Sequence, residues 1–358
     1  MAAKRSLGSV AGQVARQESH AGVTTMKAIV QHRYGPADVL ALEEIDKPVV
    51  GDQDVLLRVR AVGLNAGDGF IMRGVPYFLR LFGGLRRPRH GVRGVDVAGT
   101  ITQVGAKVTD LGPGDEVFGS CGNPLRGGAL AEYARARRGM VVAKPPTITF
   151  EQAAAVPLAA VTALQALRDR ARVQPGQRVL VNGASGGVGT FAVQLAKAFG
   201  ATVTGVCSTG NVDLVGSLGA DAVIDYTRQD FTRAPERFDV VVDNVGNHPL
   251  SACRRALTRT GVLVPNANTD GRWLGGLGRT ITALVMAPFV PQRIRPFVAS
   301  VNQADLLALT ELIGSGKLTP VIDRSYPLGQ APEAIGYLIK GHARGKVVVT
   351  VVGPGEEG

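Results

Sequence analysis

The residues of this sequence with the clearest chemical use are a run of small side chains between a strand pattern and a helical pattern. Residues 179–208 read VLVNGASGGVGTFAVQLAKAFGATVTGVCS, which predicts a buried strand, a tight turn, a helix and a second strand. Ala184, Gly186 and Gly189 occupy the three small-residue positions of the G-x-G-x-x-G pattern, with alanine in place of the first glycine. Small residues there permit the turn, the approach of a pyrophosphate to the backbone, and contact of helix with strand. The spacing therefore predicts a dinucleotide whose phosphates meet the N-terminus of the helix.

The residues after the second strand bear on which dinucleotide binds. A site that prefers NAD places an Asp or Glu on the ribose hydroxyls about twenty residues past the turn. Here Ser208 begins the sequence STGN, which offers hydroxyls to a 2′-phosphate and no carboxylate to repel it. We therefore expect NADP(H). The arginine that usually pairs with the 2′-phosphate is not evident; Arg228 is a candidate, and a solvated surface arginine is the alternative.

Length and composition restrict the class of protein. A chain of 358 residues is too long for one ordinary core and fits about two domains. An apolar fraction of 45% excludes general disorder. The cysteines are too few and too scattered for a disulfide framework or a four-cysteine zinc site, and they fit a reducing compartment; they are Cys121, Cys207 and Cys253.

The net charge of +11 raises the question of an anionic partner. Basic residues are spread along the chain apart from one cluster, which consists of Arg80, Arg86, Arg87, Arg89 and Arg93. Nucleic-acid recognition usually gathers such residues on one face or along one helix. We therefore expect a solvated or phosphate-facing surface and no nucleic-acid partner.

The first 25 residues are expected to form a flexible tail. They are polar and contain one acidic residue, Glu18, before the strand pattern that starts at Met26. An upstream start codon explains such a tail, and so does an organellar transit segment. No apolar run reaches the ~18 residues of a membrane-spanning helix, since residues 280–290 are interrupted by Pro288. The expected location is cytoplasmic, with a mitochondrial location as the alternative if the tail is a transit segment.

The order of strand and helix patterns predicts an α/β fold. Residues 26 to about 150 carry the signals of a β-rich domain, with strands expected at 55–62 and 95–104. A helical pattern then covers 150–170, and strands alternate with helices from there to about residue 300, which indicates a doubly wound parallel sheet. Later strands are expected at 238–243 and 261–264, and a last one at 346–352 that rejoins the first domain.

Several segments in this order resemble the medium-chain dehydrogenase/reductase superfamily, and within it the zinc-free quinone oxidoreductase branch. They are MKAIVQHRYGPADVL from Met26, GVDVAGTITQVG from Gly94, GPGDEVFG from Gly112, AAAVPLAAVTAL from Ala153 and GHARGKVVVTV from Gly341. The stretches GVPYFLRLFGGLRRPR and LGADAVIDYT look most like bacterial NADP-dependent quinone-type reductases and the reticulon-interacting mitochondrial homologue.

The resemblance implies a GroES-like β-barrel catalytic domain and a Rossmann domain, with the active-site cleft between them. The catalytic domain would comprise residues 26–150 and 303–358, and the NADP-binding domain residues 151–302, after the tail of residues 1–25. Besides the three small residues of the turn, the implied cofactor contacts are Ser185, Gly187, Val188, Ser208, Tyr226, Asn244 and Gly246. The last two follow the fourth strand, at the sheet edge where open α/β sheets bind ligands.

The resemblance also argues against a metal. Zinc alcohol dehydrogenases of this superfamily have a cysteine where this sequence has Asn65, a His-Glu pair in place of Val95 and Asp96, and a four-cysteine loop that is missing here. Without a Lewis acid, oxidation of simple alcohols is disfavoured, and reduction is expected instead. Asp68 and Asp96 are expected to bond backbone groups or a neighbouring arginine.

Quinones, and alkenes conjugated to a carbonyl, accept hydride into a delocalised system and demand little acid-base chemistry of the protein. The expected reaction is therefore hydride transfer from NADPH to a quinone or enone. Asn65 would position the acceptor or the nicotinamide, with a turn-forming asparagine as the alternative. The resemblance makes Tyr77 the candidate proton donor, because related enoyl-thioester reductases have a tyrosine at nearly this distance from the same Asn-x-x-Asp element, one residue nearer than Tyr77. A pocket-wall aromatic is the alternative for Tyr77.

Two other functions remain open: an enoyl-thioester reductase, and a nucleotide-binding interaction or regulatory protein with little turnover. Trp273 and the apolar residues 274–290 are expected to form a lid or to pair subunits. Binding of a membrane surface is the alternative there, because arginines flank the segment; these are Arg272, Arg279, Arg293 and Arg295. A homodimer is expected through the sheet edge near residues 261–264.

Overall fold

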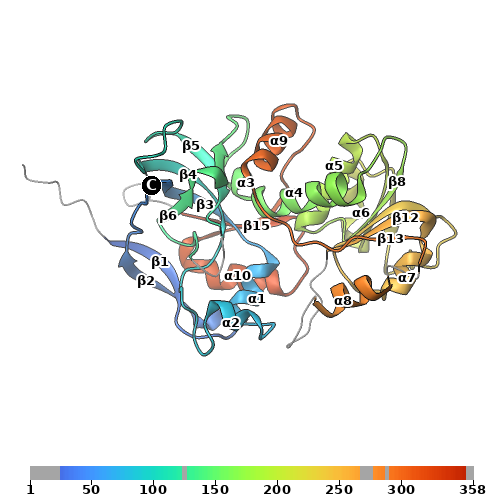
Figure 1. Cartoon of the computed structure of the whole chain (residues 1–358), viewed down its shortest axis with the longest axis horizontal. Helices are drawn as coiled ribbons and strands as arrows, with labels where there is room; N and C mark the ends of the chain where they lie inside the picture. The colour runs from blue at the N-terminus through green and yellow to red at the C-terminus, as the bar shows by residue number, and fades with distance from the viewer. Residues whose placement is uncertain (1–24, 123–126, 267–276, 287–289, 352–358) are drawn as a thin grey trace, which may run out of the picture.

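The computed structural model describes residues 25–122, 127–266, 277–286 and 290–351. Figure 1 shows two lobes, one built from the N-terminal strands together with the last strands of the chain, and the other from the middle of the chain. No helix in the ranges described is long and apolar enough to cross a membrane. The predicted tail, except its last residue, and Trp273 lie outside the described residues.

Short strands and glycine turns build the first lobe. β1 (Thr25–Gln31) pairs with β2 (Leu40–Asp46) in a small antiparallel sheet. The larger sheet has seven strands in the order β14-β15-β3-β4-β5-β7, with β6 paired to β3. These strands are β3 (Asp54–Gly63), β4 (Asp96–Val104), β5 (Glu116–Ser120), β6 (Tyr133–Arg137), β7 (Val141–Ala143), β14 (Ile322–Pro327) and β15 (Lys346–Thr350). The helices of this first lobe are α1 (Ala66–Arg73), α2 (Leu79–Gly83) and α10 (Ala331–Ile339).

The second lobe contains a six-stranded sheet in the order β10-β9-β8-β11-β12-β13, and all its pairings are parallel. Its strands are β8 (Arg178–Asn182), β9 (Thr202–Cys207), β10 (Ala222–Asp225), β11 (Phe238–Asp243), β12 (Leu257–Pro265) and β13 (Arg293–Ile294). Its helices are α4 (Pro157–Leu164), α5 (Gly187–Ala198), α6 (Val212–Ser217), α7 (Leu250–Arg255) and α8 (Leu277–Met286). β12 is thus second from the edge, and the expected dimer at this edge stays a prediction.

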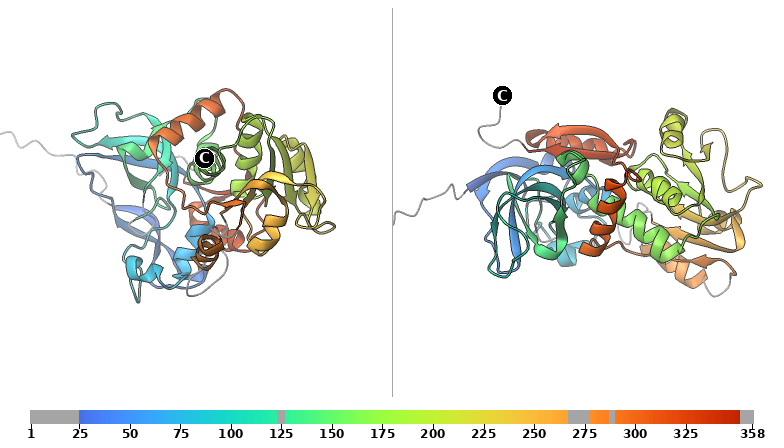
Figure 2. Two further views of the ribbon diagram at one scale, coloured as in Figure 1. Left: turned by 45° about the vertical axis from the view of Figure 1, so that its right-hand side comes forward. Right: turned by 90° about the horizontal axis from the view of Figure 1, so that it is seen from above.

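Both faces of the parallel sheet are covered, as a doubly wound fold requires. Val179 and Val181 of β8 pack in one apolar cluster with Phe191 of α5, whereas Leu180 between them packs in another with Leu250 and Cys253 of α7. Successive side chains therefore point to opposite faces. The predicted α/β fold is confirmed, and the right-hand view of Figure 2 shows helices on both sides of this sheet.

The helix predicted at 150–170 is interrupted, so that prediction was wrong in detail. The chain forms α3 (Phe150–Ala154), then α4, then one π-helical stretch over Gln165–Ala171. Pro157 is the reason for the first break, because proline has no N–H to donate and its ring collides with the carbonyl four residues earlier. Proline is tolerated at the first position of a new helix, where it begins α4.

The C-terminal segment returns to the first lobe and brings residues far apart in sequence into contact. β15 pairs antiparallel with β3 and parallel with β14. On the way, α9 (Gln303–Gly314) packs between the lobes, as both views of Figure 2 show. The loop before β15 reaches the second lobe, where Gly345 forms a parallel bridge with Gly186 of the glycine-rich turn.

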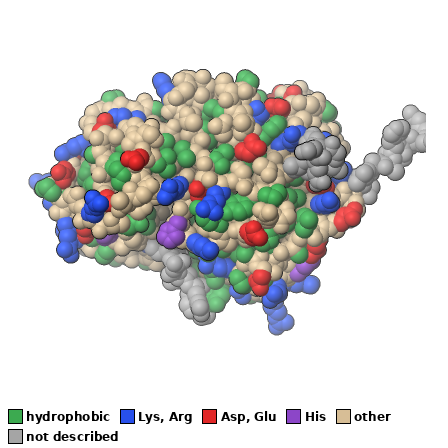
Figure 3. Space-filling view, turned by 180° about the vertical axis from the view of Figure 1, so that it is seen from behind, with side chains coloured by type: hydrophobic (Ala, Val, Ile, Leu, Met, Phe, Trp, Pro, Cys, Tyr) green, Lys and Arg blue, Asp and Glu red, His purple; other side chains and the backbone are tan. Residues whose placement is uncertain are grey.

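The surface charge is distributed over both lobes. Figure 3 shows Lys and Arg side chains spread among acidic and apolar ones over one face of the molecule, with some protruding from its lower edge. The face drawn there has no continuous basic stripe of the kind that a nucleic acid needs.

Candidate functional site

The glycine-rich turn has the geometry that its small residues predict. β8 ends at Asn182, and the turn takes a positive φ of 77° at Gly183. The backbone N–H groups of Gly183 and Ala184 both donate to the Val206 carbonyl of β9, at 3.1 and 3.0 Å. Because the residue with positive φ is Gly183, alanine is accommodated at the next position.

Gly186 and Gly189 serve different purposes. A Cβ on Gly189 would lie 2.0 Å from the Gly183 carbonyl oxygen, so only glycine lets α5 approach the turn this closely. A Cβ on Gly186 would meet nothing nearer than 3.5 Å, and α5 starts at the following residue. The open space at Gly186, beside the N-terminus of α5, is where a pyrophosphate would fit.

Ser185 and Ser208 are joined by a residue to which the sequence analysis gave no role. Nδ2 of Asn211 donates to the hydroxyl oxygens of both serines at 3.1 Å. Its Oδ1 is buried and has no hydrogen-bond partner in the described part of the chain. Gly187 and Val188 are half-buried in the first turn of α5. The structure therefore brings the turn residues and Ser208 together around one asparagine.

A carboxylate lies close to the end of β9, although the residues that directly follow this strand, STGN, contain none. The Thr209 hydroxyl donates to Oδ2 of Asp225, which ends the neighbouring strand β10, at 2.6 Å. The bond from Thr209 is the main cause of the lowered pKa of Asp225. Arg228 lies 3.6 Å from the same carboxylate. Tyr226 is 54% exposed, and its backbone N–H donates to the Cys207 carbonyl.

A second arginine approaches from the end of the chain. Arg344 is exposed in the loop before β15, and its Nη2 would lie 3.3 Å from a Cβ on Gly210. Its backbone N–H donates to Oδ2 of Asp323 at 3.1 Å, which fixes the loop. Arg344 thus places a cation beside Gly210, two residues after Ser208, although it stands 136 positions after Ser208 in the sequence.

The predicted contacts Asn244 and Gly246 lie at the same edge of the sheet, after β11. Oδ1 of Asn244 accepts from Nδ2 of Asn266 at 2.9 Å, while its own Nδ2 is buried without a partner among the described residues. The N–H of Gly246 donates to Oδ1 of Asp243 at 3.0 Å. An unpaired amide donor beside the turn, together with the open space at Gly186, fits a bound dinucleotide.

Arg279 is not one of the exposed arginines that the sequence predicts beside the apolar segment 274–290. Its guanidinium is largely buried and forms an ion pair with Asp243. It also donates to the carbonyls of Gly246 and His248 at 3.0 and 2.9 Å. Arg279 therefore anchors α8 to the loop after β11.

Asn65, the candidate catalytic residue, lies in a buried polar network at the start of α1. Its Oδ1 accepts from Nζ of Lys346 at 2.6 Å, and its Nδ2 donates to Oδ2 of Asp96 at 2.8 Å. Lys346 also donates to the Leu64 carbonyl at 2.8 Å, and Asp96 accepts from the N–H of Leu158 at 3.1 Å. The network joins β15, α1, β4 and α4, so it ties together four segments of the chain.

Burial sets the electrostatics of this network. Asp96 and Lys346 have almost no exposed surface, and Nζ and Oδ2 are 3.8 Å apart. Burial raises the pKa of Asp96 and lowers that of Lys346, and the attraction between the two charges opposes both shifts. Burial also raises the pKa of Asp68, which accepts from the N–H of Asn65, to about 6. The expected cationic neighbour of Asp96 is thus a lysine and not an arginine.

Tyr77 lies in the loop between α1 and α2 and is half-buried. The guanidinium of Arg80 lies 4.8 Å from the centre of its ring and 4.6 Å from that of Tyr34. The contact holds the Tyr77 ring from one side, as a wall residue would be held. Its role as proton donor stays a prediction.

The described residues contain no group of three or more His, Cys, Asp or Glu side chains that are placed to hold a metal ion. At the position of the zinc-binding cysteine, Asn65 is engaged by Lys346 and Asp96. The side chain at this position is thus an amide held between a lysine and a carboxylate, and the absence of a metal stays a prediction.

The fold and the turn define an NAD(P)H-dependent oxidoreductase with a GroES-like and a Rossmann-type domain. The chain matches the family "Alcohol dehydrogenase GroES-like domain" over residues 51–146 and the family "Zinc-binding dehydrogenase" over residues 218–349. Together with its relatives, these matches show that the chain belongs to the quinone oxidoreductase-like branch of the medium-chain dehydrogenase/reductase superfamily. The predicted family and fold class are confirmed.

Two similar proteins come from plants. The chain is 36% identical to the 2-methylene-furan-3-one reductase of Solanum lycopersicum, over 95% of this chain and 84% of that protein. It is also 36% identical to the chloroplastic NADPH-dependent alkenal/one oxidoreductase of Arabidopsis thaliana, over 90% of this chain and 79% of that protein. Among solved structures, the quinone oxidoreductase of Coxiella burnetii superposes with a TM-score of 0.81 at 32% identity, covering 92% of this chain and all of that one.

Proposed function

We propose that this protein transfers hydride from NADPH to a quinone or to an alkene conjugated to a carbonyl. The observation that carries the proposal is the glycine-rich turn, open at Gly186 and bordered by Arg344 and Ser208. A bound nicotinamide supplies the hydride chemistry. The chain's own residues hold the dinucleotide at the turn and, through the network around Asn65, fix the start of α1 at the junction of the lobes.

Preference for NADPH over NADH is supported by the groups at the end of β9. Ser208 and Thr209 present hydroxyls there, and Arg344 adds a positive charge from the C-terminal loop. The charge of Asp225 is compensated by Arg228 and by the Thr209 hydroxyl. Arg344 is suited to a 2′-phosphate because a guanidinium forms paired, charge-assisted hydrogen bonds with phosphate oxygens.

Replacing Arg344 with alanine is expected to raise the KM for NADPH by about tenfold to a hundredfold, the range for loss of a charge-assisted hydrogen bond. The KM for NADH should change little. Steady-state kinetics with both coenzymes measure this, and Arg259→Ala is the matched control because Arg259 is exposed in β12, three strands away from β9 in the sheet. An equal loss for NADPH and NADH in R344A would refute a 2′-phosphate contact.

The acceptor class is supported by the relatives, one of which is a furanone reductase, another an alkenal/one oxidoreductase, and a third a quinone oxidoreductase. Such acceptors take hydride without a Lewis acid, in keeping with Asn65 at the position of the zinc-binding cysteine. A steady-state screen of NADPH and NADH against quinones, enones and enoyl thioesters, with and without a chelator, tests the proposal. Preference for thioesters, absence of turnover with bound NADPH, or loss of activity on chelation would each contradict it.

Replacing Tyr77 with phenylalanine is expected to leave turnover of both quinones and enones little changed, because the ring contact with Arg80 is kept. A quinone can take its protons from water. If Tyr77 were instead the proton donor, enone reduction alone should fall by about a hundredfold or more, the usual contribution of a general acid. The ratio of kcat for the two acceptors distinguishes these roles.

A further inference from the structure

We propose that α2 and the loop after it form a docking surface for an anionic lipid membrane. The docking surface consists of Leu81, Phe82, Leu85, Arg86, Arg87 and Arg89. Docking of this kind is independent of the hydride transfer proposed above, because none of these residues belongs to the candidate site.

The segment that contains α2 and the loop after it carries positive charge only. Residues 69–95 contain six arginines and no Asp or Glu. Three of the arginines serve the lobe itself: Nε of Arg73 donates to the Gly69 carbonyl, Arg80 packs on Tyr34 and Tyr77, and Nε of Arg93 donates to Oε1 of Gln31. The sequence cluster of five arginines therefore divides into internal and external members.

The external members are Arg86, Arg87 and Arg89. All three are exposed, and none of them forms an ion pair with another described residue. Three adjacent guanidinium groups without acidic neighbours in the chain favour an anionic partner. Phosphate groups suit them best, because guanidinium binds phosphate in a paired geometry.

Large apolar side chains are exposed directly beside these arginines. Leu81, Phe82 and Leu85 are exposed by 62%, 66% and 69%. A single exposed leucine needs no explanation, but three large apolar residues within five positions form a patch of the kind that marks an interaction site. The tight turn at Gly84, with a φ of 118°, projects Leu85 and the arginines from the end of α2.

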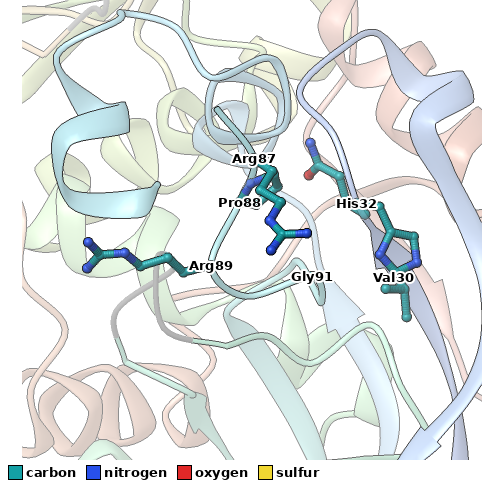
Figure 4. Close-up of a pocket in the computed structure, with 7 residues that line it drawn as sticks. Val30, His32, Arg87, Pro88, Arg89 and Gly91 are labelled. Atoms are coloured by element: carbon teal, nitrogen blue, oxygen red, sulfur yellow. The ribbon is translucent and has the colours of Figure 1, made fainter. Parts of the chain in front are cut away.

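A pocket lies behind the arginines. It has a volume of about 420 Å³ and is lined by Val30, Gln31 and His32 at the end of β1 and by residues 87–89 and Gly91 of the loop. Figure 4 shows Arg87 directed toward His32, whereas Arg89 extends to the opposite side. Nε2 of His32 lies 2.9 Å from Oε1 of Glu43, so one carboxylate stands beside a residue that lines the pocket. The pocket is large enough for a phosphate headgroup between Arg87 and His32.

The apolar character continues on the neighbouring lobe. Figure 1 shows α2 and α8 along the same lower edge of the molecule. α8 exposes Ile281 by 52% and Val285 by 62%. Two helices with exposed apolar side chains, one on each lobe, fit a flat, partly apolar partner.

A membrane surface accounts for both the apolar and the basic residues of the docking surface. Apolar side chains of an interfacial segment enter the boundary of headgroups and acyl chains, and nearby arginines are attracted to anionic lipids. A nucleic acid would bind the arginines but would leave the two exposed leucines without an apolar contact. An acidic protein would leave the phosphate-sized pocket unexplained.

Co-sedimentation of the full chain with vesicles tests the docking surface. We expect binding to vesicles made of equal parts phosphatidylcholine and phosphatidylglycerol, little binding to phosphatidylcholine alone, and release by salt. The variant R86Q/R87Q/R89Q should bind the anionic vesicles about a hundredfold more weakly, because each arginine near an anionic membrane surface contributes about 1 kcal/mol to binding. The variant L81S/F82S/L85S should also lose binding while keeping the arginines.

A matched control carries the same charge change elsewhere. Arg233, Arg255 and Arg259 are exposed on the second lobe, so R233Q/R255Q/R259Q should bind the anionic vesicles nearly as well as the native chain. Circular dichroism and NADPH binding should be unchanged in all three variants, which keeps a folding defect separate from a docking defect.

Several results would overturn the docking surface. The first is equal binding of the native chain to neutral and anionic vesicles. The second is equal binding of R86Q/R87Q/R89Q and its control variant to anionic vesicles. The third is that the native chain binds polyuridylic acid through these arginines in a salt-sensitive manner and does not bind vesicles. Conversion of a dimer to a monomer by L81S/F82S/L85S in sedimentation velocity would assign the surface to contact between two copies of this chain instead.

Discussion

Replacing Lys346 with methionine is expected to lower the free energy of unfolding by about 3–5 kcal/mol at neutral pH, the usual cost of removing one partner of a buried ion pair. The substitution leaves the carboxylate of Asp96 buried without its cation, while Oδ1 of Asn65 and the Leu64 carbonyl lose their donor. Because methionine has a similar length, the loss reports the charge and the hydrogen bonds and not a cavity. Chemical unfolding followed by circular dichroism measures the effect.

The pH dependence distinguishes this loss from a packing defect. In K346M the folded chain must protonate Asp96, whose folded pKa then lies further above its unfolded value near 4. The destabilisation is therefore small near the unfolded pKa and grows as the pH rises, by up to ~1.4 kcal/mol for each pH unit. Asp96→Asn should show the opposite trend, because the buried Lys346 must then lose its proton, at a cost that grows as the pH falls.

The double variant K346M/D96N is the matched control, since it removes both charges. It should be more stable than the sum of the two single losses predicts, and its stability should vary less between about pH 6 and about pH 9 than that of either single variant. Single losses that simply add, with no dependence on pH, would show that Lys346 and Asp96 do not act as a charged pair.

The nucleotide turn was predictable because its constraints are local. Gly183, Gly186 and Gly189 lie within seven positions, and the strand before them and the helix after them carry their own periodicity. The structure adds which glycine fulfils which steric need: the positive φ belongs to Gly183, and the closest approach to Gly189. The break before Pro157 also has a local cause, the missing N–H of proline, but the apolar period of residues 150–170 continues across it and predicted a single helix.

The partners of Asn65 and Ser208 were not predictable in the same way. Lys346 stands 281 positions after Asn65, and only the antiparallel pairing of β15 with β3 brings the two side chains within hydrogen-bond distance. Arg344 reaches Gly210 through the same loop. The run GHARGKVVVTV resembles a segment of the family, yet nothing local to it shows which of its side chains reach the other lobe.

The position of Asp225 beside the end of β9 was not predictable, because it depends on the order of the strands in the sheet. The carboxyl ends of β9 and β10 meet at one edge of the sheet because the two strands are parallel neighbours. A carboxylate at the end of the second strand therefore reaches Thr209 just after the first. Looking only at the residues that follow β9 cannot reveal it, whereas the strand order does.

Replacing Gly189 with alanine is expected to abolish NADPH binding and to destabilise the second lobe by about 3 kcal/mol or more, at the upper end of the cost of overpacking. The new methyl group would lie 2.0 Å from the Gly183 carbonyl and 2.8 Å from the Ala184 backbone, and neither can rotate away as a side chain would. Relief requires α5 to move off the turn. That movement would also separate the buried Phe191 from the apolar cluster it shares with Val179 and Val181.

Gly186→Ala is the matched control, with the same chemical change at a site of different geometry. Gly186 has φ −82° and ψ 177°, which alanine adopts without strain, and its methyl group would meet nothing nearer than 3.5 Å. We expect the unfolding free energy to stay within about 0.5 kcal/mol of the native value, while the Kd for NADPH rises by about tenfold or more because the methyl group occupies the space of the pyrophosphate. Calorimetric titration and chemical unfolding separate the two effects. Native NADPH affinity in both variants would show that the dinucleotide does not lie across this turn, and with that the proposed hydride transfer would lose its structural basis.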